Sequence, residues 1–236
     1  MAKRSVASFV EKNAPSSTAP KNRWVEARMR AFEAEGKDEY LDLVLELRGD
    51  QVIAEKIDSS PGIFTPEQIL KISQAHLPFT NWFIGTKVEL TSDILDELAE
   101  TPSYSYEVYG SYDDEPEFGA WLTETNNGFR ISYYPQALAA KHPKTRMETL
   151  EKLKKSRSKF VRGVLLERPD FVTPEDLKKA AKDKDPYVRG LVAAHEKVPL
   201  EILEVLAGDA DVEVRNLAAS NPLATPEIKA IAALLK

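Results

Sequence analysis

A phrase that occurs three times in the last third of the chain constrains the fold more than any other feature. Each copy reads Val-Arg followed by Gly or Asn: Val161-Arg162-Gly163, Val188-Arg189-Gly190 and Val214-Arg215-Asn216. The three valines lie 27 and 26 residues apart, and after a short break each copy reaches a proline, at Pro174, Pro199 and Pro226. A fixed period of this length is typical of structural repeats that stack and bury their apolar faces against one another.

Each repeat is expected to contain two short helices. We predict that Asp183 and Asp209 cap the first helices, with Ser156 at the matching place in the earlier copy, because short polar side chains accept hydrogen bonds from the free amides of a first turn. Second helices are predicted to begin at the prolines, since proline suits the first helical position. Helices of about ten residues are not stable alone in water. The predicted helix starts lie near Asp183, Pro199, Asp209 and Pro226, and the predicted common core comprises Leu191, Val192, Ile202, Leu203, Leu206, Leu217 and Ile231.

The pattern Asp-x-Asp-x-x-Val-Arg, then a small apolar run, then Asn-Pro or its equivalent and Thr-Pro-x-x-Leu, covers residues 156–236. It resembles the variant leucine-rich repeat family and is similar to HEAT and armadillo repeats. The resemblance implies an α-solenoid of short stacked helices that turn to the right. Some members of the family also carry an iron-sulfur cluster held by cysteines, but this chain has no cysteine, so no cofactor is expected.

Four segments are predicted along the chain. Residues 1–22 form a disordered basic arm with a short helix around residues 6–12, residues 23–100 a helical region, residues 101–140 a small inserted antiparallel β-sheet, and residues 141–236 the variant leucine-rich or HEAT-like repeats. The predicted fold is therefore mainly α, and α+β overall.

The helical region before the sheet leaves two interpretations open. Thr65-Pro66-Glu67 and Thr91-Ser92-Asp93 each precede a pair of branched apolar residues, as the second helices of the clear repeats do. These segments are either degenerate repeats or parts of an ordinary helical subdomain that starts with helices over 24–35 and 39–57. Neither contains the Val-Arg pair.

Aromatic and β-branched residues alternate in the segment predicted as a sheet. We expect strands over 103–112, 121–125 and 129–134, with Asn127-Gly128 as a hairpin turn. Such a sheet needs support from helices on one face. Its aromatic side chains form either a recognition surface or, as we favour, part of a core: Tyr104, Tyr106, Tyr109, Tyr112, Trp121, Phe129, Tyr133 and Tyr134.

Charge is separated along the chain although the total is only −6. Residues 88–129 contain eleven acidic residues and no Lys or Arg, whereas residues 141–162 contain nine basic residues and two acidic ones. Within the acidic stretch, Asp113-Asp114-Glu115 is either a cation site or, as we favour, a solvated loop. Within the basic stretch, Lys154, Lys155 and Arg157 are either part of a binding strip or a solvated helix face.

The recurring arginines are the sharpest candidates for binding. Stacking would place Arg162, Arg189 and Arg215 in a line that suits phosphates or an acidic partner. Alternatively, each arginine pairs with one of the recurring aspartates, Asp183 or Asp209, and forms a ladder within the stack. We favour the ladder.

No catalytic, cofactor-binding or metal-ligating residues are predicted. His76, His142 and His195 lie in separate segments, and His195 shares its repeat position with Arg168 and Asn221, which indicates a helix-end role. No phosphate-binding loop or nucleophile motif is present. No apolar run approaches the length of a membrane span.

These observations predict a non-enzymatic repeat scaffold that binds a protein or peptide through its solenoid face, in the cytoplasm, without a membrane partner. The alternative is a HEAT-like protein that binds nucleic acid, with a DNA-repair glycosylase as one form of it. The acidic total disfavours this alternative.

Overall fold

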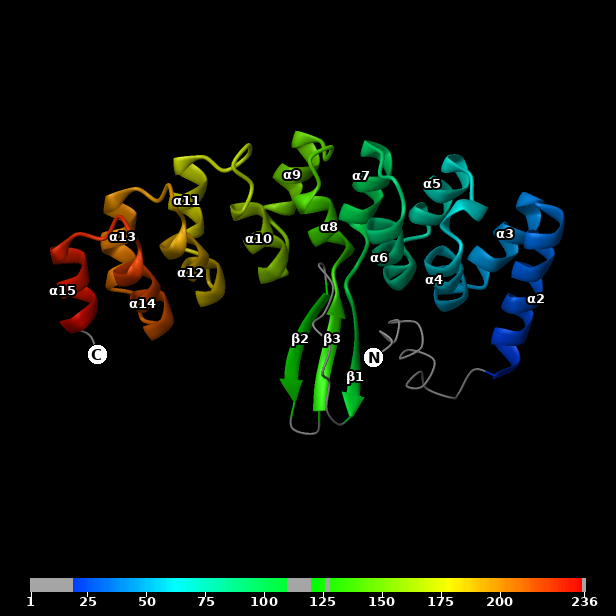
Figure 1. The fold of residues 1–236 in the computed structure, drawn as a ribbon, viewed down its shortest axis with the longest axis horizontal. Coiled ribbons are helices and arrows are strands. Elements are labelled where there is room, and N and C mark those ends of the chain that lie inside the picture. Colours follow the sequence, from blue (N-terminus) through cyan, green and yellow to red (C-terminus); the bar gives the residue numbers. More distant parts are fainter. Residues whose placement is uncertain (1–18, 110–119, 126–127, 235–236) are drawn as a thin grey trace, which may run out of the picture. The chain divides into compact units, whose positions relative to one another are not determined.

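The computed structural model describes residues 19–109, 120–125 and 128–234 of the chain. The chain divides into two compact units, residues 1–146 and 147–236. The described residues are mainly helical and include a small antiparallel sheet, as predicted (Figure 1). The predicted disordered arm over residues 1–22 is wrong for residues 19–22, which lie in a helix. Other predictions lie outside the described residues: the disorder of residues 1–18, the helix around residues 6–12, the loop Asp113-Asp114-Glu115, the role of Tyr112 and the turn residue Asn127.

The first unit is built from helices that contact one another in two series. Its helices are α2 (Ala19–Glu35), α3 (Asp38–Glu46), α4 (Asp50–Ser59), the short 3₁₀-helix η1 (Pro61–Ile63), α5 (Pro66–Gln74), α6 (Pro78–Lys87), α7 (Ser92–Glu100) and α8 (Pro135–Lys141). Helix α6 packs between α4 and α8, and α5 packs on α7. Between them lie fully buried side chains such as Ile53, Trp82 and Leu95.

Local signals set several helix ends in this unit. Thr65 and Thr91 cap α5 and α7, and Thr65 forms a capping box with Gln68. The prediction of one helix over 39–57 is wrong. Arg48 has a φ of 52°, a left-handed conformation that an α-helix cannot contain. The helix therefore ends before Arg48, and the two separate helices α3 and α4 form.

The sheet lies between α7 and α8 in the chain. Its strands are β1 (Tyr104–Tyr109), β2 (Ala120–Thr125) and β3 (Gly128–Tyr133), in the order β1-β3-β2, with both pairs antiparallel. Tyr133 is 2% exposed, and its ring lies 4.7 Å from the Trp82 ring and 5.5 Å from the Phe79 ring, both on α6. The core interpretation is therefore confirmed for Tyr133. Residues 135–140, which were predicted as part of the sheet insertion, instead start α8, with Pro135 at its first position.

The second unit contains α9 (Met147–Leu153), α10 (Lys159–Leu166), α11 (Pro174–Ala180), α12 (Pro186–Ala194), α13 (Leu200–Ala207), α14 (Val212–Ser220) and α15 (Pro226–Leu234). Helices α10, α12 and α14 contact one another in turn, and α13 packs against α12, α14 and α15. In Figure 1, α11, α13 and α15 lie on one side of this unit and α10, α12 and α14 on the other. One apolar core runs between them.

Most of the predicted core of this unit is confirmed. Val192, Ile202, Leu203 and Leu206 are buried in one cluster, and Leu191 and Ile231 pack against it partly buried. The prediction for Leu217 is wrong, since its side chain is 39% exposed. A Cβ atom at Gly190 would come within 3.0 Å of Leu217 Cδ1, so this leucine lies over the preceding first helix, outside the core.

The predicted caps of the first helices are wrong by two residues. Asp185 and Asp211 cap α12 and α14, accepting hydrogen bonds from the amides of Tyr187 at 3.0 Å and Glu213 at 2.9 Å. The cap of α10 is Ser158, without a side-chain bond, and not Ser156. Helix α13 begins at Leu200, one residue after its proline.

Asp183 and Asp209 therefore do not cap helices, and their carboxylates bind elsewhere.

Across the described ranges, no helix combines the length and the apolar character that crossing a membrane demands.

Candidate functional site

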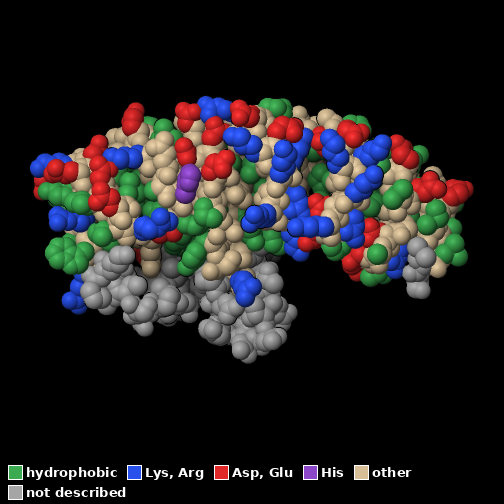
Figure 2. Space-filling view, turned by 180° about the vertical axis from the view of Figure 1, so that it is seen from behind, with side chains coloured by type: hydrophobic (Ala, Val, Ile, Leu, Met, Phe, Trp, Pro, Cys, Tyr) green, Lys and Arg blue, Asp and Glu red, His purple; other side chains and the backbone are tan. Residues whose placement is uncertain are grey.

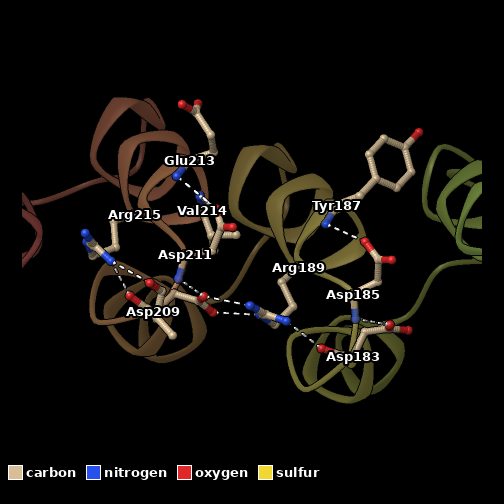
Figure 3. A network of polar contacts seen from close by, with 10 residues as sticks. Asp183, Asp185, Tyr187, Arg189, Asp209, Asp211, Glu213, Val214 and Arg215 are labelled. Carbon is tan, nitrogen blue, oxygen red and sulfur yellow. Dashed lines mark hydrogen bonds and ion pairs between the residues drawn. The ribbon is translucent and has the colours of Figure 1, made fainter. Parts of the chain in front are cut away.

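The recurring arginines of the second unit bind the recurring aspartates. Arg162 Nε and Nη2 donate to the two carboxylate oxygens of Asp183 at 2.7 and 2.8 Å. Arg189 makes the same pair of bonds to Asp209, at the same distances (Figure 3). Each arginine lies on the first helix of one repeat, and its aspartate precedes the first helix of the next. The ladder is therefore confirmed for Arg162 and Arg189.

Each guanidinium also binds the chain that leads into its own helix. The Nη1 atoms of Arg162, Arg189 and Arg215 donate to the carbonyls of Ser156, Asp183 and Asp209 at 2.8, 2.9 and 2.7 Å. The first aspartate of the Asp-x-Asp phrase thus contributes its carbonyl to one arginine and its carboxylate to another. Its carboxylate also accepts a hydrogen bond from the amide two residues later, at 2.9 Å for Asp183 and 2.8 Å for Asp209.

These contacts keep the ladder charged at neutral pH. The bond from Arg189 lowers the pKa of the Asp209 carboxyl. Burial acts to raise the pKa of Asp183, but hydrogen bonds from Arg162 and from the Asp185 amide outweigh burial and lower it. A partner could use Arg162 or Arg189 only by displacing an aspartate from a two-bond contact. Binding by Arg162, Arg189 and Arg215 stays a prediction.

The three other basic candidates, Lys154, Lys155 and Arg157, differ in their surroundings. Lys154 Nζ binds Asp176 at 2.8 Å and Glu151 at 2.7 Å, and it lies 4.2 Å from the centre of the Phe171 ring. It thereby links α9 to α11. Lys155 and Arg157 are exposed. Figure 2 shows Lys and Arg side chains crowded on the side of this unit that carries α9 to α11.

A cavity of about 330 Å³ lies among α9, α10, α11 and α12. Its apolar lining comes from Leu165, Leu166, Phe171, Val172, Ala180 and Val188. Its charged lining comes from Glu151, Lys154, Lys155, Arg162, Asp176, Lys179 and Asp183. Sequence reasoning identified Lys154, Lys155 and Arg162 here but missed Lys179, which comes from the second helix of a repeat.

A second cavity, of about 340 Å³, lies beside the C-terminal ends of α10 and α12. Its lining includes Leu191 and Ala194 of α12 together with Leu166 and Val172. Apolar residues continue from it along α12, because Tyr187, Leu191 and Ala194 are spaced to lie on one face of a helix. Tyr187 and Ala194 are exposed, and Leu191 is partly buried. That spacing is the sequence signal for this face; sequence reasoning assigned Leu191 to the core and gave Tyr187 and Ala194 no role.

The same face extends to the neighbouring first helices. Leu191 Cδ1 and Tyr187 Cε1 would lie 2.7 and 2.8 Å from a Cβ at Gly163, so both side chains lean on α10. The Tyr187 ring also meets the Phe160 ring at 5.6 Å. We call Phe160, Tyr187, Leu191 and Leu217 the first-helix strip. Tyr187 and Leu217 are 37% and 39% exposed, whereas Phe160 and Leu191 are partly buried, so the strip is open to solvent at Tyr187 and Leu217.

The histidine at the helix end has the structural role that the sequence predicts. His195 is the C-cap of α12, and its Nδ1 accepts a hydrogen bond from the Lys197 amide at 3.0 Å. Asn221 ends α14 in the same way and donates to the Ala193 carbonyl at 2.7 Å from a buried position. Among the residues that the structure describes, no three or more His, Asp or Glu side chains gather as a metal ion would require.

Comparison with known proteins finds no family model, no curated protein and no solved structure that matches the chain.

Proposed function

We propose that the chain is a non-enzymatic scaffold that binds a protein or peptide segment along the first-helix strip. In this proposal, residues 156–236 are variant leucine-rich or HEAT-like repeats stacked as an α-solenoid. The observation that carries it is the strip itself, in which neighbouring first helices carry apolar side chains at matching positions, Phe160 with Tyr187 and Leu191 with Leu217. Tyr187 and Leu217 are each more than a third exposed. Stacked repeats commonly use such a repeated face to bind extended partners.

The energetics favour a partner on this face. The polar groups of the repeat phrase are already satisfied by the ladder, so the stack needs no ligand for them. The exposed apolar surface of the strip, in contrast, is not satisfied within the chain. A partner that covered this surface would be stabilised by about 25 cal/mol for each Å² of apolar surface buried. Tyrosine is also well suited to interfaces, since its ring is apolar and its hydroxyl can bind a polar group.

The test is a selection of peptides from a random display library on the immobilised protein. Fluorescence anisotropy would then compare selected peptides on the wild type, on Tyr187→Ser and on Leu217→Ser. We expect either substitution to weaken binding by about tenfold, as loss of an interface anchor does. Val205→Ser is the matched control, because Val205 is 69% exposed on the second helix α13, away from the strip.

Thermal unfolding of all variants would verify that each is folded. Failure to enrich any peptide, or equal binding by the strip variants and the control, would contradict the proposal.

A further inference from the structure

The cavity among α9, α10, α11 and α12 is lined by more basic side chains than are paired with acidic residues of the chain. Arg162 is paired with Asp183, and Lys154 is held by Asp176 and Glu151. Lys155 and Lys179 also line the cavity, and both are exposed. Within the described part of the chain, no ion pair or hydrogen bond engages the ammonium group of either lysine.

The paired carboxylates are not available to a ligand. Burial acts to raise the pKa of Asp176, but bonds from Lys154 and Thr173 outweigh it and lower the pKa, so this acid stays charged and bound to its partners. Both carboxylate oxygens of Asp183 accept hydrogen bonds from Arg162. A ligand that enters the cavity therefore meets an apolar floor and two ammonium groups with unused donors.

We propose that this cavity accepts an apolar side chain of an acidic peptide segment in a partner protein, with Lys155 and Lys179 binding carboxylates beside that side chain. The inference rests on the proposed function and names the chemistry of the partner. An apolar lining with a few polar groups is typical of ligand sites, and about 330 Å³ is at the lower end of their volumes. The small volume suits a single side chain.

Lys154 shapes the site without binding the ligand. The ammonium of Lys154 lies over the Phe171 ring and joins α9 to α11, so it holds one wall in place. The favoured ligand is a peptide and not a nucleic acid because only two lysines of the lining have ammonium groups outside an ion pair. Tight binding of nucleic acid commonly neutralises several phosphates along the backbone.

The experiment uses two labelled pools of short peptides and the full chain. Both pools carry Phe, Leu or Trp at the centre; one has Asp and Glu on either side, and the other has Asn and Gln at the same positions. Anisotropy titrations are run at about 50 mM and about 300 mM NaCl, since exposed ion pairs weaken with salt. A mixed-sequence single-stranded DNA is titrated in parallel.

We expect the acidic pool to bind more tightly than the neutral pool and to lose affinity at the higher salt. Lys155→Gln combined with Lys179→Gln should weaken the acidic pool by about tenfold and bring it close to the neutral pool. The matched control is Lys229→Glu, which changes the net charge by the same two units at an exposed position on α15. It should bind as the wild type does.

A further variant, Ala180→Leu, places bulk in the cavity lining and should weaken both pools. Circular dichroism and the thermal midpoint would show that each variant is folded, and only folded variants enter the comparison. If Ala180→Leu is unfolded, the lysine variants alone decide the test.

The outcomes separate this inference from the proposed function. Peptide binding that depends on Tyr187 and Leu217 but not on Lys155 and Lys179 would overturn the inference and leave the scaffold intact. DNA binding that depends on the two lysines, with no preference for acidic peptides, would assign the cavity to nucleic acid and overturn it as well. Absence of binding by every peptide, including those selected from the library, would overturn both proposals.

Discussion

Removal of the Arg189 guanidinium tests whether the ladder stabilises the repeats. Arg189→Ala deletes two bonds to the Asp209 carboxylate and one to the Asp183 carbonyl. The side chains of Arg189 and Asp209 are 16% and 9% exposed, so the pair is largely but not completely shielded from water. The Asp209 carboxylate would keep one hydrogen bond, from the Asp211 amide at 2.8 Å.

The expected decrease in the free energy of unfolding lies between two limits. Breaking a buried pair costs about 3–5 kcal/mol, whereas an exposed pair contributes about 0–1 kcal/mol. With a partly shielded pair and one remaining bond on the carboxylate, we expect a loss of about 2–3 kcal/mol in the free energy of unfolding. For a chain of this size, each 1 kcal/mol lowers the melting temperature by about 2–4 °C, so the expected decrease is about 4–12 °C.

Thermal unfolding followed by far-ultraviolet circular dichroism measures the effect. Arg189→Lys should be intermediate, because lysine keeps the charge but lacks the forked pair of donors. A double-mutant cycle with Asp209→Ala should give a coupling energy of about 1–3 kcal/mol. Arg157→Ala is the control, since Arg157 is exposed, and it should change stability by less than about 0.5 kcal/mol. A melting temperature of Arg189→Ala equal to that of this control would refute the structural role.

Three further predictions concern stability. Leu203→Ala should lower the free energy of unfolding by about 2–5 kcal/mol in urea titration, because Leu203 is fully buried; a midpoint like that of the wild type would contradict the packing. Asn221→Ala should lower the free energy of unfolding by about 1–3 kcal/mol, since it removes a buried hydrogen bond to the Ala193 carbonyl. Equal protection of the neighbouring amides from hydrogen exchange in the variant and the wild type would argue against this. The pKa values of Asp183 and Asp209 are lowered by folding, so their stabilisation is present above the ordinary carboxyl pKa of about 3.9 and is lost as pH falls through the lower folded values. The stability difference between wild type and Arg189→Ala should therefore shrink below about pH 4, and a difference that stays constant in acid would contradict the charge pairing.

The sequence by itself determined those features that depend on neighbours close in the chain. Thr65, Thr91 and Thr173 cap helices by accepting a hydrogen bond from the amide three residues later, so the threonine and the following sequence carry the whole signal. The strands β2 and β3 were predictable for the same reason, since the alternation of their side chains is a local signal. Gly128, predicted as a turn residue, lies in β3 and pairs with Thr125. The period of the Val-Arg phrase also identified the repeats and their two-helix plan.

Only the tertiary structure decided features that join one repeat to the next. Asp183 and Asp185 both have carboxylates near a helix start, and local chemistry cannot tell which one caps it. Asp183 instead binds Arg162, 21 residues earlier in the chain, and this leaves the cap to Asp185.

Leu217 and Val192 illustrate the same limit for burial. Both lie in apolar runs of first helices, yet Val192 faces the shared core and Leu217 lies over Gly190 in contact with solvent. Lys154 and Lys155 are adjacent in sequence, but only Lys154 reaches Asp176 on α11. Whether a side chain is paired, buried or free to bind depends on which atoms of another repeat lie within about 3–4 Å, and stacking brings those atoms together from positions some 20 or more residues away.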